Sequence, residues 1–114
     1  MTEKELWKLV EDCNWSLDHD YDRIRVELSK LPSDVVELFD EFINDKHNIL
    51  YEKFEKDWLG NPGIDCSDDG FMDLRAEVVG RGEKFYNSIT TDKLREMCAN
   101  RDYYECFLYV LHDL

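Results

Sequence analysis

Apolar residues recur at alternating spacings of three and four positions along most of this chain, and no other feature constrains its fold as strongly. The first such stripe contains Leu6, Val10, Cys13 and Leu17. This spacing places side chains on one face of an α-helix. The sequence shows neither a repeating strand–helix pattern nor alternating runs joined by a hairpin turn. The chain is therefore predicted to be all-α.

Capping and breaking residues divide the periodic pattern into six to seven short helices. Thr2 and Glu5 predict a capping box at the first helix, and Ser33 predicts the cap of the third, after Pro32 ends the second. Residues 46–59 form a further helical stretch, which ends at the glycines and proline of residues 60–63. A helix beginning at Ser67 or Asp68 is expected to stop near residues 80–82, and two more follow.

The last segment, residues 103–111, is apolar on nearly all sides. It is predicted to be a central buried helix or a helix shared with a partner, and a strand is the alternative. A chain of 114 residues is long enough for one domain and too short for two. We therefore expect residues 1–114 to form a single compact, acidic helical domain.

The charge balance restricts the class of partner. The chain has 27 acidic and 14 basic residues, which gives a formal net charge of -13. Such a field repels phosphate backbones, so direct nucleic-acid binding is not expected. No apolar run approaches the ~18 residues of a membrane span, and the N-terminal residues lack the apolar core of a signal peptide. These features predict a cytoplasmic protein that meets a basic partner.

The four cysteines, Cys13, Cys66, Cys98 and Cys106, are widely spaced and contain no CxxC pair. In a chain without a signal peptide, this pattern favours reduced cysteines that pack as small core residues. Two disulfides are the alternative.

Residues 65–73 hold four carboxylates and approximate a calcium loop, with Asp65, Ser67, Asp69 and Asp73 as ligands. The twelfth position should supply a glutamate but is Ala76, so the start of a helix is the favoured interpretation, with Asp68 and Asp69 facing its free N–H groups. The three histidines, His19, His47 and His112, match no zinc-ligand spacing. No metal and no cofactor are expected.

Two sets of side chains are candidates for partner binding. Glu37, Asp40 and Glu41 lie on the outer side of the third predicted helix, where they form either a solvated face or a surface for a basic partner. Trp7 and Trp15 are either core residues or aromatic anchors in an interface.

The block Cys66-Ser67-Asp68-Asp69-Gly70-Phe71, followed by Leu74-Arg75 and by the glycines of residues 80–82, resembles a bacterial family catalogued as domain of unknown function 4240. The resemblance covers most of the chain and implies an all-helical fold, with no assigned activity. Leu74 stands where the family pattern usually has Phe, and Glu77 where it usually has Trp. In this arrangement Arg75 could reach back toward Asp68 and Asp69.

Without a catalytic motif, a small acidic domain of this kind resembles immunity proteins. We expect a stoichiometric binding protein, not an enzyme, that blocks the basic cleft of a cognate toxin, for example a nuclease of contact-dependent growth inhibition. One alternative is a small ligand-binding module or enzyme built on Asp68, Asp69 and Arg75. Another is an acidic DNA mimic that acts on a DNA-binding protein.

Overall fold

The longest element of the computed structural model is the helix α4 (Ser33–Leu59), which contains 27 residues. At about 1.5 Å per residue it is about 40 Å long, and it accounts for most of the 45 Å long dimension of the molecule. No glycine or proline occurs between Pro32 and Gly60 to interrupt it. The helical stretches predicted from residue 33 and over residues 46–59 are therefore one helix, not two. None of the helices in the described part of the chain, α4 included, has an apolar stretch long enough to cross a membrane.

The structure describes residues 1–111, and within them every regular element is helical, which confirms the all-α prediction. The remaining elements are α1 (Glu3–Asp12), α2 (Trp15–Asp18), α3 (Tyr21–Leu28), α5 (Asp68–Gly80), α6 (Glu83–Ser88), α7 (Thr91–Ala99) and the short 3-10 helix η1 (Phe107–Leu111).

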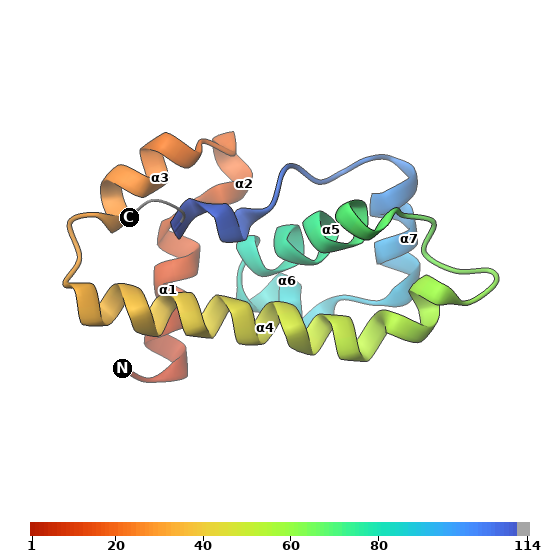
Figure 1. Cartoon of the computed structure of the whole chain (residues 1–114), viewed down its shortest axis with the longest axis horizontal. Helices are drawn as coiled ribbons and strands as arrows, with labels where there is room; N and C mark the ends of the chain where they lie inside the picture. The colour runs from red at the N-terminus through yellow and green to blue at the C-terminus, as the bar shows by residue number, and fades with distance from the viewer. Residues whose placement is uncertain (112–114) are drawn as a thin grey trace.

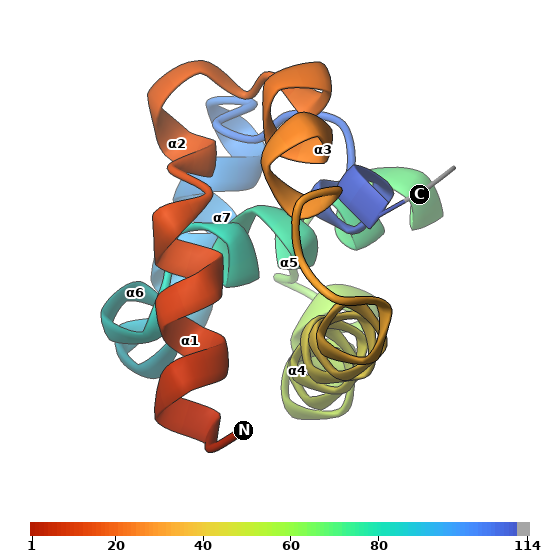
Figure 2. The ribbon, with the colours of Figure 1, turned by 90° about the vertical axis from the view of Figure 1, so that its left-hand side faces the viewer.

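The central element is α5, which lies beside α4 and contacts α1, α6, α7 and η1 (Figure 1). Nearly all of its residues from Gly70 to Gly80 are buried. The prediction that residues 103–111 form the central helix is wrong, because only the short η1 forms there. Its neighbouring side chains Cys106, Phe107 and Val110 still fill the core. Figure 2 looks along α4 and shows the other helices gathered on one side of it, so that its opposite side is uncovered.

Helix starts agree with the sequence where a side chain closes the first turn. Thr2 and Glu5 form the predicted capping box, and the Ser67 hydroxyl accepts from the Gly70 N–H at the start of α5. The first apolar stripe ends earlier than predicted, because Asn14 has a positive φ of 51° and separates α1 from α2. Leu17 is consequently 79% exposed. The prediction that Ser33 caps the third predicted helix is wrong, because the N-cap of α4 is Pro32 and Ser33 is its first helical residue.

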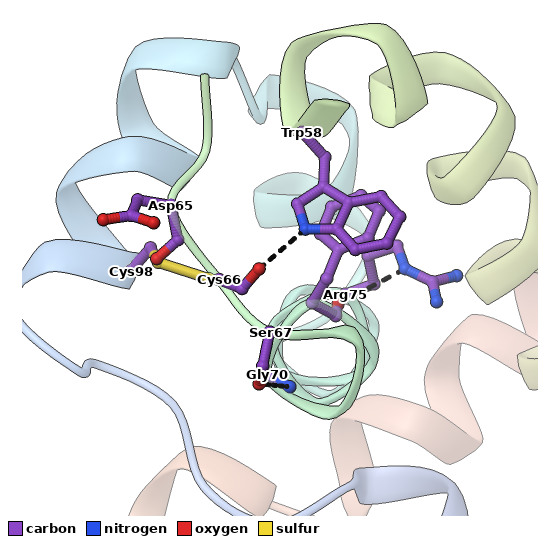
Figure 3. The surroundings of a disulfide bond; sticks show 8 residues. Trp58, Asp65, Cys66, Ser67, Gly70, Arg75 and Cys98 are labelled. Carbon is purple, nitrogen blue, oxygen red and sulfur yellow. Dashed lines mark hydrogen bonds between the residues drawn. A yellow bond between two sulfur atoms is a disulfide. The ribbon is translucent and has the colours of Figure 1, made fainter. Parts of the chain in front are cut away.

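Cys66 and Cys98 form a disulfide that joins the segment before α5 to α7, with 6.4 Å between their Cα atoms (Figure 3). The expectation that these two cysteines are reduced is wrong. They are 32 positions apart, and only the packing of α7 against α5 brings them together. Cys13 and Cys106 are free and buried, as small core residues.

Because this cross-link spans 32 residues, opening it is expected to lower the free energy of unfolding by about 2–4 kcal/mol. The measurement is urea denaturation of the chain with and without dithiothreitol. A Cys66→Ser/Cys98→Ser variant should match the reduced chain and should not respond to the reductant. Equal stability of the oxidised and reduced chains would contradict the assigned pairing.

Candidate functional site

The first half of α4 carries five acidic residues and no basic residue between Leu31 and Asp45. We call this surface the α4 acidic face; all five side chains belong to exposed residues, namely Asp34, Glu37, Asp40, Glu41 and Asp45. The next base, Lys46, is bound to Glu3 of α1. Within residues 1–111 none of the five carboxylates makes a salt bridge. The α4 acidic face therefore concentrates uncompensated negative charge.

Helical geometry explains why these acids share one side. Positions 34, 37, 41 and 45 differ by three or four residues and lie on one face of a helix. The opposite face is apolar and carries Phe39 and Ile43, both fully buried against the rest of the protein. Asp40 lies beside the row, where its carboxylate accepts from the Asn44 amide at 2.9 Å. The predicted candidates Glu37, Asp40 and Glu41 thus lie together on the surface.

A surface pocket of about 350 Å³ adjoins this face at the junction of α3 and α4. Glu37 is its acidic member, and Leu28 in its lining is buried. The full lining consists of Leu28, Ser29, Leu31, Ser33, Val36 and Glu37. The pocket therefore offers an apolar wall beside a free carboxylate.

The expectation that Trp7 or Trp15 presents an aromatic anchor to a partner is wrong. The two residues are 2% and 1% exposed, respectively. Trp7 packs edge-on against Phe42, with 5.1 Å between the ring centroids. The indole N–H of Trp15 donates to the Glu77 carboxylate at 3.0 Å. Both rings belong to the core, which was the alternative interpretation.

Asp68 and Asp69 occupy the first turn of α5, where their charge complements the helix dipole. Both are exposed. Within residues 1–111 their carboxylates make no hydrogen bond or ion pair, since the hydroxyl of Ser67 provides the side-chain cap. They define the start of a helix and do not line a pocket with Arg75.

Arg75 points away from these acids, into the interface between α5 and α4 (Figure 3). It is 7% exposed and lies over the rings of Tyr51 and Phe71, 4.9 and 4.8 Å from their centroids. Its Nε donates to the carbonyl of Phe71, and its Nη1 donates to the carbonyl of His47 at 3.1 Å. The expectation that Arg75 reaches back to Asp68 and Asp69 is wrong, because burial directs the side chain toward α4.

His47 supports Arg75 in its neutral form. Its Nε2–H donates to the Met72 carbonyl at 3.0 Å, which leaves Nδ1 as an acceptor 3.3 Å from Nη1 of Arg75. Burial lowers the pKa of His47 from 6.5 to about 4, against the opposing effect of the Met72 hydrogen bond and with a further lowering by the Arg75 charge.

Sequence reasoning missed the most extensive buried polar cluster, which surrounds Glu77. The fully buried carboxylate accepts from Trp15 Nε1, from Arg81 Nε at 2.9 Å and from the Tyr104 backbone N–H at 3.3 Å. His19 Nε2 lies 3.4 Å from it, and the His19 ring stacks on Tyr104. The one signal in the sequence was Glu77 itself, an acid between the apolar residues Ala76 and Val78. These partners connect α2, α5 and the segment before η1, so the cluster holds the fold together.

The four residues considered as calcium ligands do not form a metal site in the structure. Ser67 is a cap, and Asp65 and Asp69 are exposed. The pKa of Asp73 is raised, first by burial and then by the charges of Glu105 and Asp69. No three His, Cys, Asp or Glu side chains in the described part of the chain are placed to hold a metal ion. His112 lies outside the described residues.

Comparison with known proteins places the chain in a family. A family model described as "Protein of unknown function (DUF4240)" matches residues 1–113, and the chain belongs to that family. No curated protein matches the chain, and no solved structure matches it.

The pKa of His47 leads to a prediction about stability. Because the folded-state pKa, about 4, lies below the ordinary value of 6.5, the unfolded chain binds the proton more readily. The contribution of neutral His47 is complete above pH 6.5 and is lost as the pH falls toward 4, with a total loss of about 3 kcal/mol. Urea denaturation across this range, followed by tryptophan fluorescence, measures the loss.

The matched comparison is His47→Gln against His19→Gln. We expect the His47 variant to lose this part of the pH dependence, whereas the His19 variant retains it. Parallel pH profiles for wild type and His47→Gln would show that His47 does not control it.

Proposed function

We propose that this member of the family is a stoichiometric binding protein whose partner is a basic protein. In its most specific form, the proposal is that the chain is a cytoplasmic immunity protein. It would neutralise a cognate toxin, such as a nuclease of contact-dependent growth inhibition, by covering the toxin's active-site cleft. The observation that carries the proposal is the α4 acidic face, with its exposed carboxylates and no intervening base.

The physical basis is charge complementarity. A nuclease cleft is lined with cations that attract phosphates, and a rigid row of carboxylates can occupy the same cleft. The acids at positions 34, 37, 41 and 45 succeed one another at about 4.5–6 Å along α4. Because the opposite side of α4 is fixed in the core by Phe39 and Ile43, the row keeps this spacing before a partner arrives. Binding then loses little conformational entropy on this side of the interface.

The pocket beside Glu37 offers an apolar contact to a partner, which the buried Trp7 and Trp15 do not. Its aliphatic wall, which includes Leu31 and Val36, suits the hydrocarbon part of a partner lysine or arginine, and Glu37 suits the charged end. We therefore place a long basic side chain of the partner in this pocket. In this arrangement the pocket belongs to this chain, and the side chain that fills it belongs to the partner.

Buried polar groups elsewhere support binding over catalysis. Arg75 and His47 hydrogen-bond to each other and to backbone carbonyls, and Glu77 is surrounded by donors. The atoms that make these bonds are engaged inside the protein and are not presented to a substrate. Asp68 and Asp69, the other members of the alternative ligand or enzyme site, are far from enclosed because both are exposed.

Capture of the partner at low and high salt, from an extract of the organism that encodes the chain, tests the proposal. We expect one basic protein to bind in a 1:1 complex, to be released by salt, and to lose its activity while bound. Glu37→Gln/Asp40→Asn/Glu41→Gln should slow association by about 10- to 100-fold.

The matched control is Asp12→Asn/Glu27→Gln/Glu96→Gln. It removes the same number of negative charges, each from an acid of α1, α3 or α7 that is paired with a lysine. This variant should bind as the wild type does. Equal weakening by both variants, or binding that salt does not affect, would contradict the proposal. A captured DNA-binding protein without toxic activity would favour the DNA-mimic alternative instead.

A further inference from the structure

The Cys66–Cys98 disulfide borders a second pocket, on the face of the molecule formed by α7 and the loop before α5. The volume of this pocket is about 420 Å³, within the range of small-molecule sites. Cys98 lines it and Cys66 does not. The full lining consists of Gly63, Asp65, Arg95, Cys98, Ala99 and Arg101.

The pocket contains a cation that the rest of the described chain does not neutralise. Arg101 is exposed, and within residues 1–111 its guanidinium forms no hydrogen bond or ion pair. Arg95 is committed, because it donates to the Pro62 carbonyl at 2.8 Å and pairs with Asp92 at 3.3 Å. Asp65 contributes one negative charge to the lining. The free guanidinium beside Cys98 therefore suits a single carboxylate group of a bound molecule.

We propose that this pocket is a site of thiol–disulfide exchange for a low-molecular-weight thiol that carries a carboxylate, with the carboxylate on Arg101 and the thiolate at Cys98. The pocket and the unpaired guanidinium supply binding, and the disulfide at the pocket wall supplies the reacting bond.

The chemistry needs no oxidant or reductant beyond the thiol itself. The thiolate attacks Sγ of Cys98, a new bond forms between the two sulfur atoms, and the Cys66–Cys98 bond breaks. Cys66 leaves with the electron pair as a thiolate and takes a proton from water. A second thiol molecule then attacks the mixed disulfide, which returns Cys98 as a thiol and releases the symmetrical disulfide of the small molecule.

Attack from this pocket makes Cys66 the leaving group. Cys66 immediately precedes Ser67, the N-cap of the 13-residue helix α5, so its thiolate would lie near the positive end of the helix dipole. The carboxylates of Asp65, Asp68 and Asp69 nearby act in the opposite direction. The helix end and the acids oppose each other at Cys66, so selectivity among thiols is expected to come from Arg101.

The loop has other attachments that survive opening of the disulfide. Arg95 holds the Pro62 carbonyl of the loop, and the side chain of Ile64 is buried. Thr91 Oγ1 of α7 also donates at 2.8 Å to Asp57 of α4, the helix that leads into the loop. The Trp58 indole also donates to the Cys66 carbonyl at 2.9 Å (Figure 3). Exchange is therefore expected in a chain that stays folded, and it is independent of partner binding at α4.

The test compares rates of disulfide opening by glutathione, which carries carboxylates, by neutral 2-mercaptoethanol and by cationic cysteamine, each corrected for thiolate fraction and basicity. If the pocket did not bind the thiol, the net charge of -13 would attract cationic cysteamine, which would then open the disulfide fastest of the three. We expect the ratio of the glutathione rate to the 2-mercaptoethanol rate to fall about fivefold in Arg101→Gln, which is the effect of one exposed guanidinium–carboxylate pair. Lys84→Gln on α6 removes the same charge outside the pocket and should leave the ratio unchanged.

Peptide mapping supplies a readout that does not depend on rates. In Cys66→Ser the neighbouring thiol that would re-form the disulfide is absent, so incubation with oxidised glutathione, with no reduced thiol added, should leave an adduct on Cys98, formed more slowly when Arg101→Gln is added. An unchanged rate ratio in Arg101→Gln, or a Cys98 adduct whose formation is indifferent to Arg101, would overturn the proposal. Circular dichroism of each variant verifies that it is folded.

Discussion

Glu77 places a carboxylate inside the protein, and donors from three separate parts of the chain surround it. Trp15 comes from α2, Arg81 from the end of α5, and the Tyr104 backbone from the segment before η1. A buried carboxylate must have such partners, because removing even one leaves a costly unpaired group. The positions of α2 and of the 103–106 segment are therefore tied to one side chain of α5.

The same helix carries a second buried ion two residues earlier. Positions 75 and 77 point to nearly opposite sides of a helix, so Arg75 faces α4 while Glu77 faces α2. α5 is thus bonded to its neighbours on both sides, and Gly80 lets Trp15 and Phe107 pack directly against its backbone. The buried charges of Arg75 and Glu77 therefore serve to hold α5 against its neighbours.

The features of this fold that depend on neighbouring residues were predictable from the sequence. Those that depend on residues far apart in the chain were not. The capping box at Thr2 and the Ser67 cap depend on residues three positions apart, and both were predictable. The disulfide joins residues 32 positions apart and was not predicted. The central place of α5 was also missed, because Arg75 and Glu77 are charged residues of the kind usually found on the surface, and here both are buried. Of the candidate site, the acids of α4 were correctly placed on the surface. Trp7 and Trp15 were expected on the surface but are buried. A shift of one position along a helix turns a side chain by about 100°, which is enough to move such a ring from the surface into the core.

The two sides of α4 are subject to different physical demands. Phe39, Ile43 and Leu50 on its inner side determine how the molecule packs, whereas substitutions among its outer acids change stability by only about 0.5 kcal/mol. Evolution can therefore rewrite the outer pattern of charge without disturbing the interior. Related chains can therefore differ in the charges of this surface while they retain one architecture.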